Sequence, residues 1–462
     1  MMAAKTAGIF FLSDLTPPSI ERTWLTAPHP RIPIVAACSS DKTVRIYSLT
    51  NFRLLSTVSG GHKRSVRTCA WKPHVQGESV LATGSFDATV GIWRRWDNYG
   101  SGDSADGTWD IDGSANEVRD ADSSLPDRGY DRDDDEEEWR FAVLLDGHDS
   151  EVKSVSWSPS GMLLATCSRD KSIWIWEDLD DGDNNFETVA VMQEHGGDVK
   201  CVAWHPVEEC LASGSYDDTI RLWREDIDDW TQVACIKGHE GTVWSVDWEA
   251  VDNVPSSSLP GLSNGSTSPA VSRWKEQNAV SGPRLISSSD DRTIRVWRRQ
   301  PKDQQRYNTS NMPSIIRPTG IEESWEEEAI LPRVHDLSIY TVAWSKRTGL
   351  VASVGADGRI VVYEEQFMPT TTISSRNDQE EATQEDEEAG VEAEAMEMDS
   401  PAQRTKWSII ASLQGAHGVY EINHVAWAKR ADRGRRQDKE EEVLVTTGDD
   451  GSVKVWGIGH AR

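Results

Sequence analysis

The sequence of 462 residues is poor in cysteine, which excludes two kinds of protein. It contains six cysteines, too few for a disulfide-stabilised scaffold of this size. They form no C-x-x-C pair, and no spacing of cysteine and histidine matches a zinc site. We therefore expect small, buried, reduced thiols, no bound metal and no cofactor.

Long apolar runs and positive charge are scarce as well. No run approaches the roughly 18 apolar residues that span a bilayer, and the stretch from Gly8 to Leu12 is too short for a signal peptide. The 48 Lys and Arg face 77 Asp and Glu, a net charge of −29, which argues against direct binding to nucleic acid or to an anionic membrane. We expect a protein of the cytoplasm, and also of the nucleus.

What the chain does have is a sizeable apolar fraction and an internal repeat. Hydrophobic residues make up 37% of the sequence, with 21 Trp, which is enough for a large core. Seven times, a short alternating run ends in Trp or Tyr six residues after an aspartate. These aspartates are Asp41, Asp87, Asp170, Asp217, Asp291, Asp357 and Asp450.

A second phrase precedes six of the seven copies: a histidine, a few polar residues, and a run that ends in Trp. The histidine lies 22 residues before the aspartate in three copies, and 25, 52 and 33 residues before it in the others. A fixed distance with occasional longer values indicates one structural unit with insertions in one loop. The histidines are His62, His148, His195, His239, His335 and His417.

These phrases resemble the WD-repeat family, whose G-H…W-D signature recurs at about 40–45 residues. The resemblance implies an all-β fold, a single seven-bladed β-propeller over residues 1–462, with strands a to d in each blade from the channel outward. A segment near residues 7–15 would close the ring as the outer strand of blade 7. The expected blades are about 16–49, 52–94, 140–177, 187–224, 230–298, 325–363 and 406–457.

The repeated histidines and aspartates are expected to stabilise the blades. The resemblance places the His, the Asp, a Ser or Thr four residues before the Asp, and the strand-c Trp in one buried hydrogen-bond network. In blade 3 these would be His148, Asp170, Thr166 and Trp176. Six copies around a ring favour structure over acid–base chemistry, so we predict no enzyme. The first repeat departs from the pattern, with no His before Trp24 and Ala37 where Ser or Thr is expected.

Long insertions fall only in a–b and c–d connections, which lie on one face of a propeller. Composition predicts that they are disordered: residues 95–138 carry 16 acidic and 4 basic residues, and residues 364–403 carry 13 acidic and one basic. They are either solvating surface loops or acidic segments that bind a partner. The predicted disordered insertions are 95–138, 250–283, 299–324, 364–405 and 428–441.

The opposite face, which we call the compact face, bears the d–a and b–c connections, all of them short. Basic and aromatic residues dominate its strand-a starts and b–c turns, and Arg, Trp and Tyr are enriched at binding hot spots. The alternative is that these are simply solvated strand ends. The predicted partner-binding residues are Arg67, Lys153, Lys200, Trp244 and Tyr340 at strand starts, and Phe86, Arg169, Lys171 and Tyr216 in turns.

Two stretches resemble one branch of the WD-repeat family. The segments 147–177, with its S-R-D-K-S turn, and 211–230, with S-Y-D-D-T, look like blades 3 and 4 of the WD-repeat subunits of the cytosolic iron–sulfur protein assembly (CIA) machinery. The resemblance implies a non-catalytic scaffold in the targeting complex. Because protein-bound iron–sulfur clusters need several cysteine ligands, the chain would dock proteins without holding a cluster.

The resemblance also implies the partners. They are a small acidic CIA adaptor subunit, a HEAT-repeat scaffold, an iron-only-hydrogenase-like factor and iron–sulfur apo-proteins that receive clusters. Arg169, the Arg of the S-R-D-K-S turn, is the first candidate for a partner contact. Alternatives are a WD-repeat substrate receptor, a chromatin-associated peptide-binding module and, third, an enzyme. The sequence shows no F-box, nucleophile motif or phosphate loop.

Overall fold

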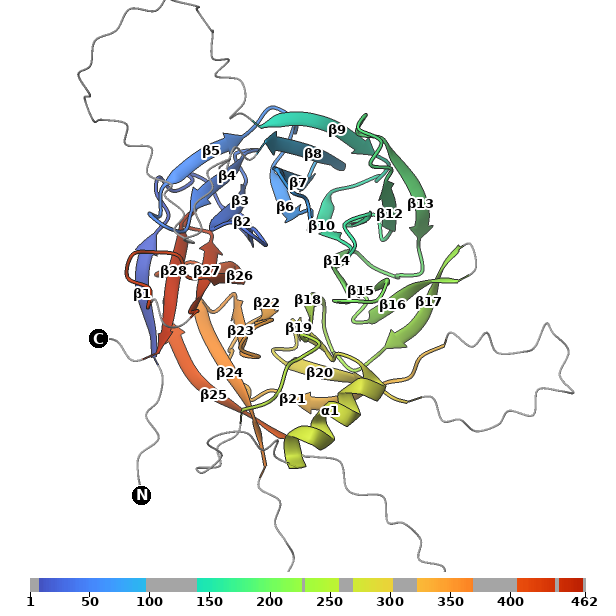
Figure 1. Ribbon diagram of the computed structural model, residues 1–462, viewed down its shortest axis with the longest axis vertical. Coiled ribbons are helices and arrows are strands. Elements are labelled where there is room, and N and C mark those ends of the chain that lie inside the picture. The colour runs from blue at the N-terminus through green and yellow to red at the C-terminus, as the bar shows by residue number, and fades with distance from the viewer. Residues whose placement is uncertain are drawn as a thin grey trace, which may run out of the picture.

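The structure, a computed structural model, is a ring of seven four-stranded antiparallel sheets around a channel (Figure 1). It describes residues 8–96, 139–226, 229–256, 269–301, 322–368, 405–436 and 440–459. The predicted seven-bladed propeller is confirmed. In each sheet the first strand lines the channel and the fourth lies at the circumference.

The first four sheets each contain four strands, which follow one another in the chain from the channel outward. They are β2 (Thr23–Pro28), β3 (Ile34–Ser39), β4 (Val44–Ser48) and β5 (Leu54–Val58); β6 (Val66–Trp71), β7 (Glu78–Ser85), β8 (Thr89–Trp96) and β9 (Arg140–Asp146); β10 (Val152–Trp157), β11 (Leu163–Ser168), β12 (Ile173–Asp178) and β13 (Phe186–Met192); and β14 (Val199–Trp204), β15 (Cys210–Ser215), β16 (Ile220–Asp226) and β17 (Asp229–Ile236).

The remaining three sheets are built in the same order, and the last contains both ends of the described chain. They are β18 (Val243–Trp248), β19 (Leu285–Ser289), β20 (Ile294–Arg299) and β21 (Trp325–Ile330); β22 (Ile339–Trp344), β23 (Val351–Gly355), β24 (Arg359–Phe367) and β25 (Thr405–Gln414); and β26 (Ile422–Lys429), β27 (Glu442–Gly448), β28 (Val453–Gly459) and β1 (Gly8–Asp14).

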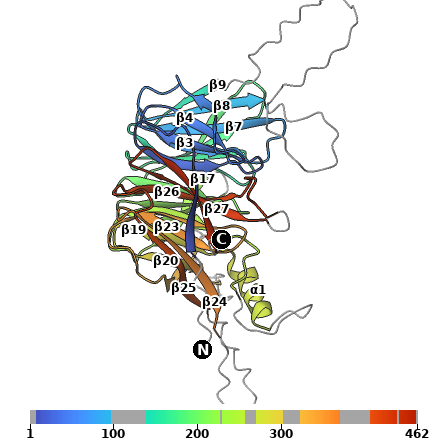
Figure 2. The same cartoon turned by 90° about the vertical axis from the view of Figure 1, so that its left-hand side faces the viewer.

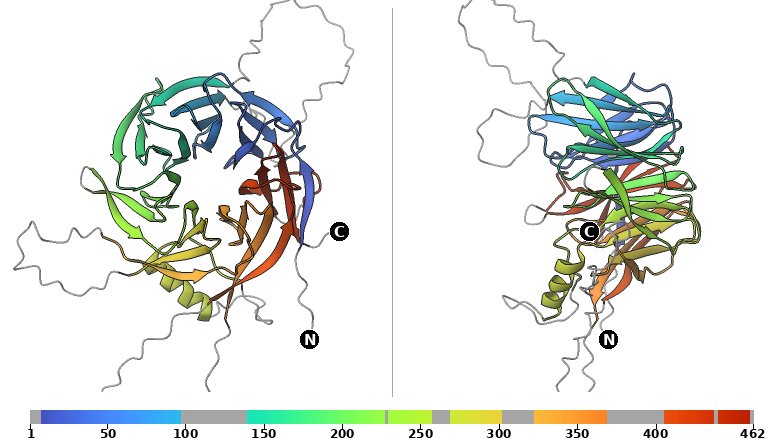
Figure 3. Two further views of the ribbon diagram at one scale, coloured as in Figure 1. Left: turned by 180° about the vertical axis from the view of Figure 1, so that it is seen from behind. Right: turned by 90° about the vertical axis from the view of Figure 1, so that its right-hand side faces the viewer.

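The ring is closed by pairing the first strand with the last. Strand β1 runs antiparallel to β28, with Gly8 opposite Gly459 and Phe11 opposite Trp456, and the view from behind shows the two strands side by side (Figure 3). This is the closure predicted for residues near 7–15. It leaves the seventh sheet dependent on both ends of the described chain.

The core lies between neighbouring blades and follows from the strand patterns. The second strand of each blade is buried along its whole length or nearly so, as in Leu163–Ser168, because both faces of a central strand pack against adjacent sheets. Outer strands alternate or are largely exposed, as in Phe186–Met192. In one cluster, Trp223 of β16 packs with Leu163 and Ile175 of the preceding blade.

The predicted segments differ from the observed sheets by one strand. Segment 140–177, for example, begins with β9, which pairs with β8 in the preceding sheet. The predicted segments therefore correspond to sequence repeats. Their bounds were wrong as the bounds of the sheets. Each repeat contributes its first strand to the outside of the blade before it, so the repeats interlock around the ring.

The prediction that 250–283 is disordered was wrong for its second half. Residues Pro269–Ser281 form the only helix in the described part of the chain, α1, which projects from one face of the ring (Figure 2). Its Trp274 is 1% exposed, and the indole donates to the carbonyl of Asn253 at 3.2 Å. Composition missed the helix because one buried Trp anchors an otherwise polar segment.

Arg284, just after α1, is the centre of a buried ion cluster. It is 0% exposed and makes bidentate hydrogen bonds with Glu249 (2.7 and 2.9 Å) and with Glu365 (2.6 and 2.9 Å). Its guanidinium lies 4.7 Å from the ring centroid of Trp274 and 5.1 Å from that of Trp344. The cluster joins blade 5, blade 6 and the insertion helix.

Other predicted insertions are also shorter than expected. Strand β26 continues to Lys429, and Arg430 pairs with Asp432 and Glu441, so the described part of 428–441 is a paired turn, contrary to the prediction of disorder. Strand β24 includes residues 364–367, because Glu365 belongs to the Arg284 cluster. The rest of 95–138, 299–324 and 364–405 lies almost entirely outside the described residues.

Candidate partner-binding site

The six His–Asp pairs lie inside the blades, as predicted. In blade 3, His148 Nδ1 is 3.0 Å from Asp170 Oδ2, and His148 Nε2 is 2.9 Å from Thr166 Oγ1. Trp176 donates to the same hydroxyl at 3.0 Å. Five other blades repeat the His–Asp contact at 2.9–3.4 Å: His62–Asp87, His195–Asp217, His239–Asp291, His335–Asp357 and His417–Asp450.

Hydrogen bonding within the blades fixes the charge of these aspartates. Burial alone would raise the pKa of Asp170, but hydrogen bonds from His148 and Ser172 outweigh burial and hold that pKa well below its ordinary value. For His195, burial lowers the pKa despite the contact with Asp217. Both ring nitrogens of each histidine are occupied within its own blade, so the network positions the b–c turn that reaches the compact face.

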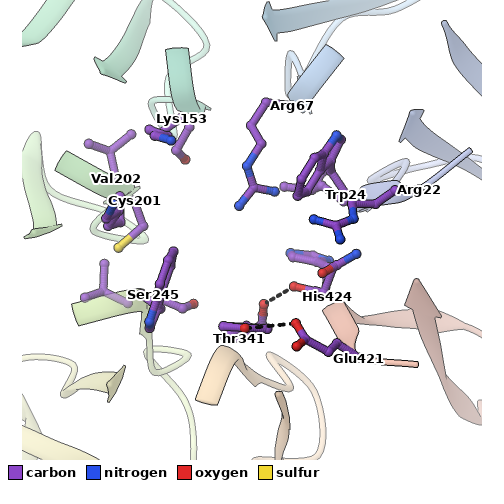
Figure 4. A pocket seen from close by; sticks show the side chains of 17 residues that line it. Arg22, Trp24, Arg67, Lys153, Cys201, Val202, Ser245, Thr341, Glu421 and His424 are labelled. Carbon is purple, nitrogen blue, oxygen red and sulfur yellow. Dashed lines mark hydrogen bonds between the residues drawn. The ribbon is translucent and has the colours of Figure 1, made fainter. Parts of the chain in front are cut away.

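A cavity of about 330 Å³ opens at the compact face, at the mouth of the channel (Figure 4). All seven channel-lining strands contribute to its wall, because the second residue of each strand a points toward the axis. Five of the nine predicted partner-binding residues line it. They are Arg67, Lys153, Lys200, Trp244 and Tyr340.

Cations and aromatic rings lie against one another in the wall of this cavity. Arg67 lies 4.6 Å from the ring centroid of Trp24, and Lys200 lies 5.0 Å from that of Trp244. Two predicted turn residues join the wall from outside, since Lys153 lies over Phe86 at 5.8 Å and Lys200 over Tyr216 at 5.4 Å. Cation–π contacts of this kind hold flexible side chains in place at modest energy, about 0.5–1 kcal/mol each when exposed.

Carboxylates accompany most of these side chains. Lys153 pairs with Glu151, and Lys200 lies 3.3 Å from Asp198. Burial lowers the pKa of Lys153, and the nearby charges of Lys200 and Arg67 add to the effect against the pull of Glu151. Trp244 donates to Asp290 at 2.6 Å. The predicted rim residues are therefore pre-positioned.

Arg169 and Lys171 lie outside the cavity lining. Both are exposed in the turn between β11 and β12, and the backbone N–H of Arg169 donates to the carbonyl of Glu151 at 3.1 Å. This bond joins the turn to the residue just before β10, the strand that carries Lys153. Their role as partner-binding residues remains a prediction.

Sequence reasoning missed several wall residues, above all Trp24. The repeat pattern suggests Trp24 as the end of a strand a, but it is the second residue of β2, and Pro28 ends that strand. A usable signal existed, because Trp24 precedes Asp41 by 17 residues, as Lys153 precedes Asp170. The other missed wall residues include Arg22, Glu421 and His424.

Thiols and metal ligands offer little chemistry in the described ranges. All six cysteines are free, and burial raises the pKa of Cys201, which lines the cavity, to about 12. No group of three or more His, Cys, Asp or Glu side chains there is arranged to hold a metal ion. Nor does that part of the chain contain a helix of the length and apolarity needed to cross a membrane.

Comparison with known proteins agrees with the repeat. The family model "WD domain, G-beta repeat" matches residues 52–94, 139–177, 186–224, 264–298, 328–364 and 407–457. The first repeat, which lacks the histidine, is absent from this match.

Full-length relatives are similar to the chain. Proteins named "Probable cytosolic iron-sulfur protein assembly protein 1" are 68% identical in Aspergillus flavus, over 98% of both chains, and 66% identical in Aspergillus terreus, over 99% of this chain and all of the relative. The protein of that name from Emericella nidulans is 66% identical over 99% of this chain and 98% of its own length. The chain belongs to the WD-repeat family of cytosolic iron–sulfur protein assembly proteins.

Proposed function

We propose that the chain is a non-catalytic scaffold of cytosolic iron–sulfur protein assembly that docks other proteins on its compact face. The observation that carries the proposal is the cavity at the channel mouth, where Arg67, Lys200 and Trp244 are held in place by contacts within the rim. Arg and Trp anchors held in fixed positions are typical of interaction hot spots. The names of the relatives support the pathway.

The proposed partners are those of a targeting complex: a small acidic adaptor subunit, a HEAT-repeat scaffold, an iron-only-hydrogenase-like factor and apo-proteins that receive clusters. The cluster is cargo in this proposal, and the chain contributes docking. We propose that the protein acts in the cytosol, and also in the nucleus for apo-proteins that are located there.

The test is affinity purification of the tagged full chain from a fungal cell extract, followed by mass spectrometry. We expect recovery of assembly subunits and iron–sulfur apo-proteins, and weaker recovery with Arg169→Glu, which reverses the charge of an exposed turn residue on the compact face. A matched control is Arg273→Glu on α1, an exposed residue outside the compact face. Recovery of ubiquitin-ligase subunits or histones in place of assembly proteins would refute the proposal and favour a receptor or chromatin module.

A further inference from the structure

Among the described residues, one cation of the cavity wall has no counter-ion. Arg67 is half-buried, and its guanidinium forms no hydrogen bond or ion pair with any residue that the structure describes. It lies over the face of Trp24, at 4.6 Å from the ring centroid, and the side chain reaches into the cavity (Figure 4). Burial lowers the pKa of Arg67, against the more distant attraction of Glu151.

Such a site is unsatisfied without a ligand. Removing a guanidinium from water costs free energy unless an anion and hydrogen bonds compensate it. Arginine presents N–H donors in a fork that fits a carboxylate with two parallel hydrogen bonds. The Trp24 ring already fixes the plane of this fork, so a carboxylate can bind with little loss of side-chain freedom.

The charges around Arg67 indicate how much negative charge fits. The other three cations of the wall are paired locally: Arg22 with Asp449, Lys153 with Glu151 and Lys200 with Asp198. Glu421, which accepts a hydrogen bond from Tyr340 at 2.9 Å, adds a negative charge to the wall. Four carboxylates therefore already balance the four cations, and only Arg67 has no direct partner among the described residues, so a single carboxylate fits better than a phosphate dianion.

We propose that the cavity binds one Asp or Glu side chain of an acidic segment of a partner protein, with Arg67 as the recognition cation. This inference rests on the proposed function of the compact face. A segment of chain fits better than a free acid, because exposed Tyr216 packs on Lys200 of the wall, and a passing peptide would contact its ring.

The probe is a phage-displayed library of random octapeptides, selected against the full chain. We expect the enriched peptides to contain Asp or Glu, and this preference to disappear with Arg67→Gln. The matched control is Arg22→Gln, which removes the same charge from a residue already paired with Asp449 and keeps the preference. Absence of any enriched peptide, or an equal acidic preference with Arg67→Gln, would overturn the inference.

A selected peptide then gives an affinity by fluorescence anisotropy. Loss of one charge-assisted pair is expected to weaken binding about tenfold, whether Arg67 or the acidic residue of the peptide is neutralised, with no further loss when both are changed. The peptide substitution leaves the protein intact, so it tests the proposal even if Arg67→Gln unfolds. A phosphoserine peptide that binds more tightly than its acidic counterpart would contradict the single-carboxylate site.

The outcomes separate this inference from the proposed function. If Arg67→Gln captures assembly proteins as the unaltered chain does while Arg169→Glu fails to, the scaffold function stands and the carboxylate site falls. If assembly proteins are recovered equally with every compact-face variant, the proposed docking face itself is wrong.

Discussion

Two arginines on opposite sides of the ring make the same kind of aromatic contact in different electrostatic surroundings. Arg284 lies between Trp274 and Trp344 and is satisfied by Glu249 and Glu365. Arg67 lies on Trp24 and has no counter-ion among the described residues. An arginine whose charge is paired with buried carboxylates stabilises the fold and cannot bind a further anion. An arginine without such a carboxylate can still bind an anionic ligand. The pairing of the charge therefore distinguishes a structural from a binding arginine.

The largest expected effect comes from neutralising the compensated arginine. Arg284→Met leaves Glu249 and Glu365 buried without a cation, and breaking a buried ion network in this way costs about 3–5 kcal/mol. Arg67→Met removes a half-buried charge that has no ion pair among the described residues, so the unfolding free energy of this variant should change by less than about 1 kcal/mol or rise. Urea unfolding followed by Trp fluorescence measures both. Equal losses would remove the distinction between the two arginines.

As the pH falls, buried histidines should destabilise the fold at a higher pH than protonation of the carboxylates in the Arg284 cluster does. Burial lowers the pKa of His424 to about 3, helped by Arg67, and burial lowers those of His29 and His205 to about 4. The unfolded chain takes up these protons below pH 6.5 and the folded chain does not, so stability falls as the pH drops from about 6.5 to 4. Each histidine contributes up to about 1.4 kcal/mol per pH unit.

The measurement is the urea unfolding free energy at several pH values in that range. His424→Leu should reduce the dependence of the unfolding free energy on pH, because the unfolded chain then takes up one proton fewer. Arg284 lowers the pKa of Glu249 against the effect of burial, so this carboxyl should lose its charge at a lower pH than an ordinary glutamate. A slope unchanged by His424→Leu would show that this imidazole titrates alike in both states.

Substituting one tryptophan of the Arg284 cluster and one of the cavity wall separates stability from binding. Trp274→Ala empties a buried site and is expected to cost about 3 kcal/mol, with partner capture retained at low temperature. Trp244→Ala should cost about 1 kcal/mol or less, because the ring is only half-buried, and weaken partner capture about tenfold. Loss of capture by both variants would mean that the insertion helix also binds partners.

The repeat made the ring and its His–Asp networks predictable from sequence, because each copy carries the same local hydrogen bonds. Five of the wall residues were predictable for the same reason, because each follows its repeat histidine by five residues. Trp24 was missed because the first repeat lacks its histidine. The Arg284 cluster was beyond prediction, since Glu249, Arg284 and Glu365 lie far apart in sequence and meet only where blades 5 and 6 pack.

The smallest effect is expected from shortening the acidic segments, and it depends on where the cut is made. Replacing residues 100–135 and 372–401 by short Gly/Ser linkers should leave the unfolding free energy within about 1 kcal/mol, because segments of this composition bury little apolar area and longer loops add little closure entropy. A deletion that begins at Glu364 removes Glu365 and should resemble Arg284→Met. Thermal unfolding of the two deletion variants side by side measures this difference. Equal melting temperatures for the two deletion variants would mean that Glu365 and its ion pair with Arg284 do not stabilise the fold.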